Sequence, residues 1–139
     1  LGPISRIASG GELSRIMLAL KNVFAEKDGV DALIFDEIDT GVSGVAAQRV
    51  AEKLAVLGRT KQVLCVTHLP QIAAMAQQQY LVEKAERGGR TYTSIRLLDR
   101  EGRRQELARL SGGDMVTDTQ LASAEELLSR DEKFRNSLN

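Results

Sequence analysis

Three carboxylates stand close together directly after an apolar run. The run ALIF is followed by Asp36 and Glu37, and Asp39 comes two residues later. A strand that ends in a solvated acidic turn is common and needs no catalytic role. An adjacent Asp–Glu pair also suits nucleotide hydrolysis, because the aspartate can hold Mg²⁺, often through water, and the next acid can reach a water beside the terminal phosphate. The pair therefore predicts Asp36 as the magnesium residue and Glu37 as the general base.

His68 is the single histidine of the chain, and it ends a second apolar run, QVLCVTH. A lone histidine is more often structural than catalytic. Two parallel strands joined by a helix, however, place their carboxyl ends at one edge of a sheet. His68 would then lie beside Asp36 and Glu37, where it could hydrogen-bond a γ-phosphate or the attacking water.

A Ser-Gly-Gly turn followed by an acid occurs twice in the chain. The first comprises Ser9, Gly10, Gly11 and Glu12, and it opens an amphipathic run. The free N–H groups at the start of a helix bind phosphate, and the same residues also read as a capping box, in which Ser9 caps and Glu12 reaches back. Both interpretations use the same N–H groups and are compatible.

The second Ser-Gly-Gly turn, Ser111 to Gly113, follows the helical run RQELARL and precedes Met-Val-Thr. The β-branched pair Val116 and Thr117 makes a poor helix start. We therefore predict that these glycines end the preceding helix, and that the first turn is the one that binds phosphate.

The elements that must position these residues follow from apolar spacing and turn residues. Strand, helix and strand in succession predict an α/β fold with a parallel βαβ core, followed by an antiparallel hairpin and C-terminal helices. The expected elements are a helix over 11–25, a strand over 32–36, a helix over 45–57 that stops at Gly58, a strand over 62–68, a short helix over 72–76, a hairpin over 80–98 that turns at Gly88-Gly89, and helices over 103–110 and 119–129, with a frayed polar tail from residue 130.

Composition limits the class of protein. With 139 residues and 42% hydrophobic content, the chain has the size of one domain with a real core. Nineteen basic and nineteen acidic residues cancel, which leaves no global electrostatic case for nucleic-acid or membrane binding. The single Cys65 cannot form an internal disulfide, and no apolar run approaches the roughly 18 residues of a membrane span. These features predict a soluble, cytoplasmic protein.

One segment is locally basic. Its acidic neighbours favour an ordinary solvated surface, and the alternative is a lobe that docks DNA or a protein without nucleotide. The basic residues are Arg87, Arg90, Arg96, Arg100, Arg103 and Arg104.

The order of these motifs resembles the C-terminal half of an ABC-type ATPase head. Among such heads, ASGGELSR, FDEIDTGVSG and VTHLPQIAA are most similar to the RecN family, SMC-like ATPases of bacterial double-strand-break repair. The resemblance implies a P-loop NTPase fold, ATP and Mg²⁺ as ligands, and head dimerisation. It further implies these roles: Ser9, Gly10, Gly11 and Glu12 as the signature that contacts ATP held by a second head, Asp36 as the Mg²⁺ residue, Glu37 as the base, Asp39 in the D-loop, and His68 as the γ-phosphate switch.

Two features of such proteins are missing from the sequence. It has no Gly-Lys pair, hence no G-x-x-x-x-G-K-[ST] phosphate loop, and no heptad repeat. The resemblance therefore implies that residues 1–139 are the C-terminal lobe, inactive alone, whose partners are the N-terminal lobe with Walker A, a second head and, through the full-length assembly, DNA near the nucleoid. Part of an ABC transporter nucleotide-binding domain is the less favoured alternative.

Overall fold

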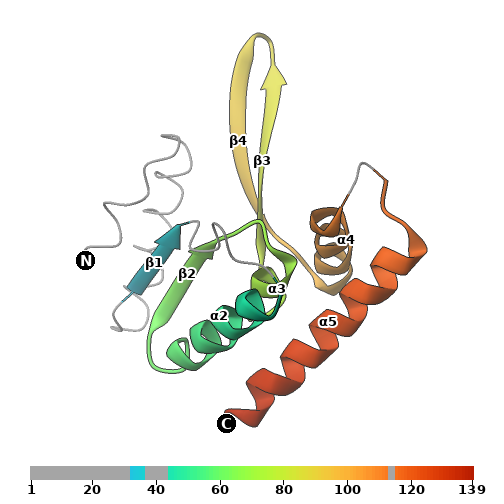
Figure 1. Ribbon diagram of the computed structural model, residues 1–139. Helices are drawn as coiled ribbons and strands as arrows, with labels where there is room; N and C mark the ends of the chain where they lie inside the picture. Colours follow the sequence, from blue (N-terminus) through green and yellow to red (C-terminus); the bar gives the residue numbers. More distant parts are fainter. Residues whose placement is uncertain (1–31, 37–43, 113–114) are drawn as a thin grey trace.

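The computed structural model describes residues 32–36, 44–112 and 115–139, which form an α/β arrangement (Figure 1). The helix predicted over 11–25 lies outside these residues. No described helix combines the length and apolar character needed to cross a membrane. The elements are β1 (Ala32–Asp36), α2 (Gly44–Leu57), β2 (Gln62–Val66), α3 (Pro70–Ala73), β3 (Tyr80–Arg87), β4 (Arg90–Leu97), α4 (Arg100–Ser111) and α5 (Asp118–Ser137).

The predicted parallel βαβ unit is confirmed. Strands β1 and β2 pair in parallel, from Ala32 opposite Gln62 to Asp36 opposite Val66, and α2 connects them. On α2, Ala47 and Ala51 are fully buried, one turn apart on the same side of the helix. The helix ends at Leu57, directly before Gly58, as predicted.

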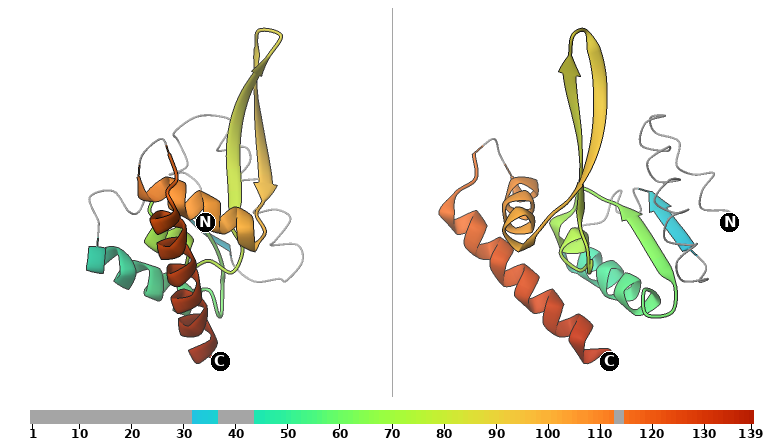
Figure 2. Two further views of the ribbon diagram at one scale, coloured as in Figure 1. Left: turned by 90° about the vertical axis from the view of Figure 1, so that its right-hand side faces the viewer. Right: turned by 180° about the vertical axis from the view of Figure 1, so that it is seen from behind.

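The predicted hairpin is also confirmed. Strands β3 and β4 pair antiparallel, and the ribbon extends away from the helices (Figure 2). Gly88 and Gly89 form its two-residue turn with φ of 57° and 77°. Two successive positive φ values suit glycine and match the right-handed twist of the strands.

Side-chain caps fix where the last two helices begin. Asp99 accepts a hydrogen bond from the N–H of Gly102 at 2.7 Å, so α4 begins at Arg100, three residues before the predicted start. Thr117 and Gln120 form a reciprocal capping box at the start of α5.

The prediction that the chain frays from residue 130 is wrong, because α5 continues to Ser137. Three side chains of this last stretch are anchored on the rest of the molecule. Asp131 is fully buried and accepts a hydrogen bond from Gln48 of α2, Phe134 packs against the apolar cluster around Ile72, and Arg135 donates to backbone carbonyls. A polar-looking tail is thus a packed helical end.

The short segment 72–76, here called the α3 turn, joins two apolar clusters. Ala73 and Ala74 pack with Leu107 and Leu128 of α4 and α5. Ile72 and Met75 pack with a second cluster that includes Ala51 of α2. The α3 turn therefore connects the βαβ unit to the C-terminal helices.

Two arginines bind the carbonyls of the α3 turn. Arg103 donates to Ala73, Ala74 and Ala76 at 3.1, 3.3 and 2.9 Å. Arg135 donates to Ala74 and Met75 at 3.4 and 3.1 Å. Burial, reinforced by the neighbouring positive charge of Arg135, lowers the pKa of Arg103 to about 10, so the guanidinium remains charged at neutral pH.

Replacing Arg103 by methionine should destabilise the protein by about 3 kcal/mol, because buried carbonyls lose their donors. Urea unfolding measures the change. Arg104→Met, one residue along α4, removes a side chain whose partner is the exposed Glu101 and should cost less than about 1 kcal/mol. Equal losses in the two variants would contradict the role given to Arg103.

Asp131 predicts a pH-dependent stability difference. Burial raises the pKa of its carboxyl, a rise that the hydrogen bond from Gln48 and the charge of Arg130 only partly offset, and Oδ2 has no hydrogen-bond partner. The folded state therefore favours the protonated acid. The stability that Asp131 contributes is fully present below its ordinary pKa and is lost as the pH rises through the raised value.

The Asp131→Asn variant should accordingly gain stability relative to the parent as the pH rises from 3 to 7. Urea unfolding of both proteins across this range isolates the effect, because all other groups cancel in the difference. A stability difference that stays constant, or that falls with rising pH, would disprove this account of Asp131.

Candidate active site

The carboxyl ends of β1 and β2 coincide, as the sequence predicts, but β2 ends at Val66 and not at the predicted His68. Asp36, the last residue of β1, lies opposite Val66, the last residue of β2. The chain leaves both strands at this edge, toward residue 37 on one side and Thr67 on the other. The backbone therefore brings Asp36 and the Thr-His segment to one end of the sheet.

His68 lies in the short loop between β2 and α3, and its side chain is exposed. The hydroxyl of Thr67 accepts a hydrogen bond from the N–H of Leu69 at 3.0 Å, and Pro70 then begins α3. This turn fixes the direction in which the chain leaves β2. His68 follows Val66 by two residues, so the predicted proximity of its backbone to the end of β1 agrees with the strand register.

The other predicted site residues lie outside the described residues, and their placement stays a prediction. These are Ser9, Gly10, Gly11, Glu12, Glu37 and Asp39. Within the described ranges, no three His, Cys, Asp or Glu side chains gather as metal ligands. Glu37 and Asp39 lie outside those ranges.

Helix α4 ends at Ser111 and Gly112 of the second Ser-Gly-Gly turn, as predicted, whereas Gly113 lies outside the described residues. Ser111 is the last residue of α4, and its hydroxyl donates to the carbonyl of Leu107 at 2.9 Å. Gly112 follows with a φ of 153°. The carbonyl of Gly112 accepts from the side chain of Gln120, which ties this end of α4 to the start of α5.

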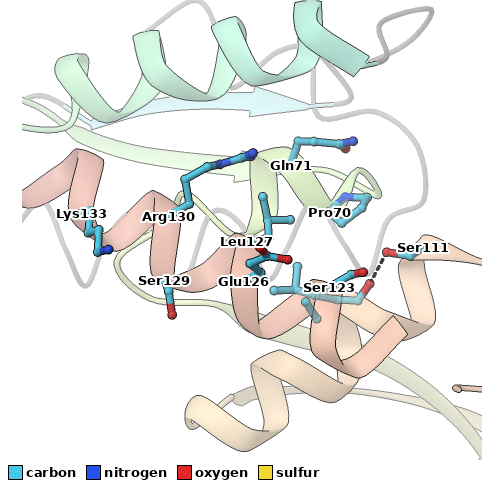
Figure 3. Close-up of a pocket in the computed structure, with 11 residues that line it drawn as sticks. Pro70, Gln71, Ser111, Ser123, Glu126, Leu127, Ser129, Arg130 and Lys133 are labelled. Atoms are coloured by element: carbon cyan, nitrogen blue, oxygen red, sulfur yellow. Dashed lines mark hydrogen bonds between the residues drawn. The ribbon is translucent and has the colours of Figure 1, made fainter. Parts of the chain in front are cut away.

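A groove lies where α3, α4 and α5 meet (Figure 3). Pro70 and Gln71 border it on one side and Ser123 and Leu127 on another. Its charged lining residues, Glu126, Arg130 and Lys133, all come from α5. Neither Asp36 nor His68 lines this groove.

The prediction that Arg103 is a solvated surface residue is wrong. Arg103 is only 8% exposed and binds the α3 turn. Its flanking residues, Gly102 and Arg104, are polar or small, so the local pattern carries no signal of burial.

No protein-family model matches the chain. One solved chain, from work on ATP-driven dimerization and DNA-stimulated activation of SMC ATPases, superposes with a TM-score of 0.49 and 20% identity, over 78% of this chain and 65% of that chain.

The curated relatives are far more similar. DNA repair protein RecN of Halalkalibacterium halodurans is 49% identical over 91% of this chain, that of Vibrio cholerae 50% over 92%, and that of Bacillus subtilis 44% over 97%. The chain spans only 22–23% of the length of these relatives. Identity of this level along nearly the whole chain shows that it belongs to the RecN family of DNA repair proteins, of which it represents one segment.

Proposed function

We propose that this chain is the C-terminal lobe of an ATP-hydrolysing, SMC-like P-loop NTPase head that acts in repair of DNA double-strand breaks. The observation that carries the proposal is the coincidence of the strand ends, with Asp36 opposite Val66 and His68 two residues beyond. This is the edge at which open α/β sheets bind ligands. The similarity to RecN proteins supports the same function.

Each candidate residue has a role that its chemistry suits. The carboxylate of Asp36 is the kind of oxygen donor that Mg²⁺ prefers, directly or through water. Bound Mg²⁺ would neutralise charge on the phosphates. Glu37 removes a proton from the attacking water, and His68 hydrogen-bonds the γ-phosphate or that water. A general base so placed contributes about 10²- to 10⁴-fold in rate.

The signature acts on the nucleotide of another head. The N–H groups at Ser9, Gly10 and Gly11, with Glu12 one residue further, stabilise the γ-phosphate of an ATP that the Walker A loop of a second head holds. Asp39 lies in the D-loop at the contact between heads. ATP thus joins two heads, and hydrolysis separates them, which couples the cycle to DNA held by the full-length assembly.

The N-terminal lobe is the necessary partner in this scheme. A Walker A loop supplies most of the grip on the β- and γ-phosphates, and this chain has none. The lobe alone is therefore expected to bind ATP poorly and to hydrolyse almost none.

Glu37→Gln in the full-length protein should lower ATP turnover by at least about 10²-fold, because the amide cannot accept the proton, while ATP-dependent dimerisation persists. A coupled ATPase assay and size-exclusion chromatography with ATP measure the two properties. Glu126→Gln, the same change at an exposed position of α5, is the control and should leave both unchanged. Normal hydrolysis by Glu37→Gln would remove this residue from the role of base.

Ser9→Arg should block dimerisation of heads while ATP binding at Walker A persists, because a large cation would occupy the place of the second head's phosphate. Binding of a fluorescent ATP analogue, compared with ATP-driven dimerisation, separates the two effects. An unimpaired ATP-driven dimer would rule out contact in trans through Ser9.

A further inference from the structure

The far end of the β3–β4 hairpin concentrates positive charge on one face. Residues that pair directly across an antiparallel ribbon share a face, and successive pairs alternate. Arg87 pairs with Arg90 beside the glycine turn, and the next pair on the same face is Ala85 with Tyr92. Both arginines are exposed, and Tyr92 is 50% exposed. The three side chains form what we call the hairpin tip.

Elsewhere in the basic segment, the arginines are already engaged. Arg96 pairs with Glu83, Arg100 with Glu125, and Arg104 with Glu101. Arg103 is buried against the α3 turn. Among the described residues, neither Arg87 nor Arg90 has an ion-pair partner or a side-chain hydrogen bond. The segment that the sequence presents as one basic run therefore retains uncompensated charge only at the hairpin tip.

The pairing of Arg87 with Arg90 lowers the stability of the hairpin when no anion is bound. Like charges directly opposite each other on a ribbon are destabilising, and an anion placed between them reverses the sign of the interaction. Glu86, the nearest acid in sequence, pairs with Thr91 on the opposite face. The exposed apolar residues Val82 and Leu97 also lie on that opposite face, nearer the base. The tip itself offers arginine and tyrosine without an apolar patch.

We propose that the hairpin tip binds the phosphate backbone of duplex DNA, an inference that rests on the proposed function in DNA repair and assigns a contact surface to it. The guanidinium groups of Arg87 and Arg90 suit bidentate contact with phosphate oxygens. A two-stranded ribbon fits the major groove, which is about 12 Å wide. Tyr92 packs against the adjoining sugar. Because the contacts are to the backbone, binding is independent of sequence.

The neutral overall charge of the chain is compatible with this proposal. The ribbon projects from the remainder of the described structure (Figures 1 and 2), so the two arginines can reach DNA while the acidic residues of α4 and α5 stay distant from it. The hairpin tip can therefore bind phosphate through its local positive charge, even though the net charge of the chain is zero.

The test compares two double variants of the full-length protein. Arg87→Ala with Arg90→Ala should weaken binding of duplex DNA about tenfold or more and should make the slope of log K against log salt shallower by about 2. Arg49→Ala with Arg59→Ala, exposed arginines on α2 and in the turn after it, removes the same charge far from the tip and should leave affinity and slope close to those of the parent. Fluorescence anisotropy with a labelled duplex at several salt concentrations measures both.

Parental affinity and salt slope in the tip variant would overturn the proposal, as would equal losses in the two double variants, which would indicate an effect of net charge alone. ATPase activity without DNA should be unchanged in the tip variant. The ATPase role is tested separately at Glu37 and Ser9. A negative result for DNA binding at the hairpin tip would therefore leave the ATPase role intact, and a negative result at Glu37 or Ser9 would leave the DNA contact at the tip intact.

Discussion

The α3 turn depends on charge-assisted hydrogen bonds from two arginines that are distant in sequence. Arg103 and Arg135 donate to carbonyls between residues 73 and 76, where a helix of only four residues ends. Buried carbonyls without donors would be costly. The carbonyl of Ala73 also accepts from the N–H of Ala76 at 3.3 Å, and the arginines add donors to it and its neighbours. The two guanidinium groups therefore hold together the packing of α4 and α5 against the βαβ unit. The cost of desolvating Arg103 is offset by the several carbonyls that it satisfies.

The α3 turn also holds one end of the segment that carries His68. The chain leaves β2 at Val66, passes His68 and enters α3 at Pro70, so the segment that carries the candidate switch is fixed at one end by the sheet and at the other by the α3 turn. The small side chains of Ala73 and Ala74 allow α4 and α5 to pack closely against the α3 turn. A loop between two packed elements can position a histidine while leaving its side chain exposed to a ligand.

The arginines of the basic segment fall into two groups, one buried in the interior and one on the surface. In a chain of zero net charge, Arg103 serves the interior, and Arg96, Arg100 and Arg104 pair with acids. Exposed pairs of this kind contribute little to stability, but they neutralise the surface around them. Arg87 and Arg90 remain because the hairpin register sets them opposite each other. A local electrostatic feature thus arises from strand pairing rather than from composition.

The sequence by itself determined the type and order of the elements, since apolar runs, the Gly88-Gly89 turn, the stop at Gly58 and the end of α4 at Ser111 all depend on local chemistry. It also predicted that the two strands end at one edge of the sheet, because parallel βαβ connections leave little freedom in their topology. The second strand, however, ends at Val66 and not at His68. Tertiary structure alone decided that α5 extends past residue 130 and that Asp131 and Arg103 are buried, because those outcomes depend on contacts with α2 and the α3 turn, which no local pattern encodes. It likewise decided that Arg100 is neutralised, because its partners Glu125 and Glu132 lie on α5.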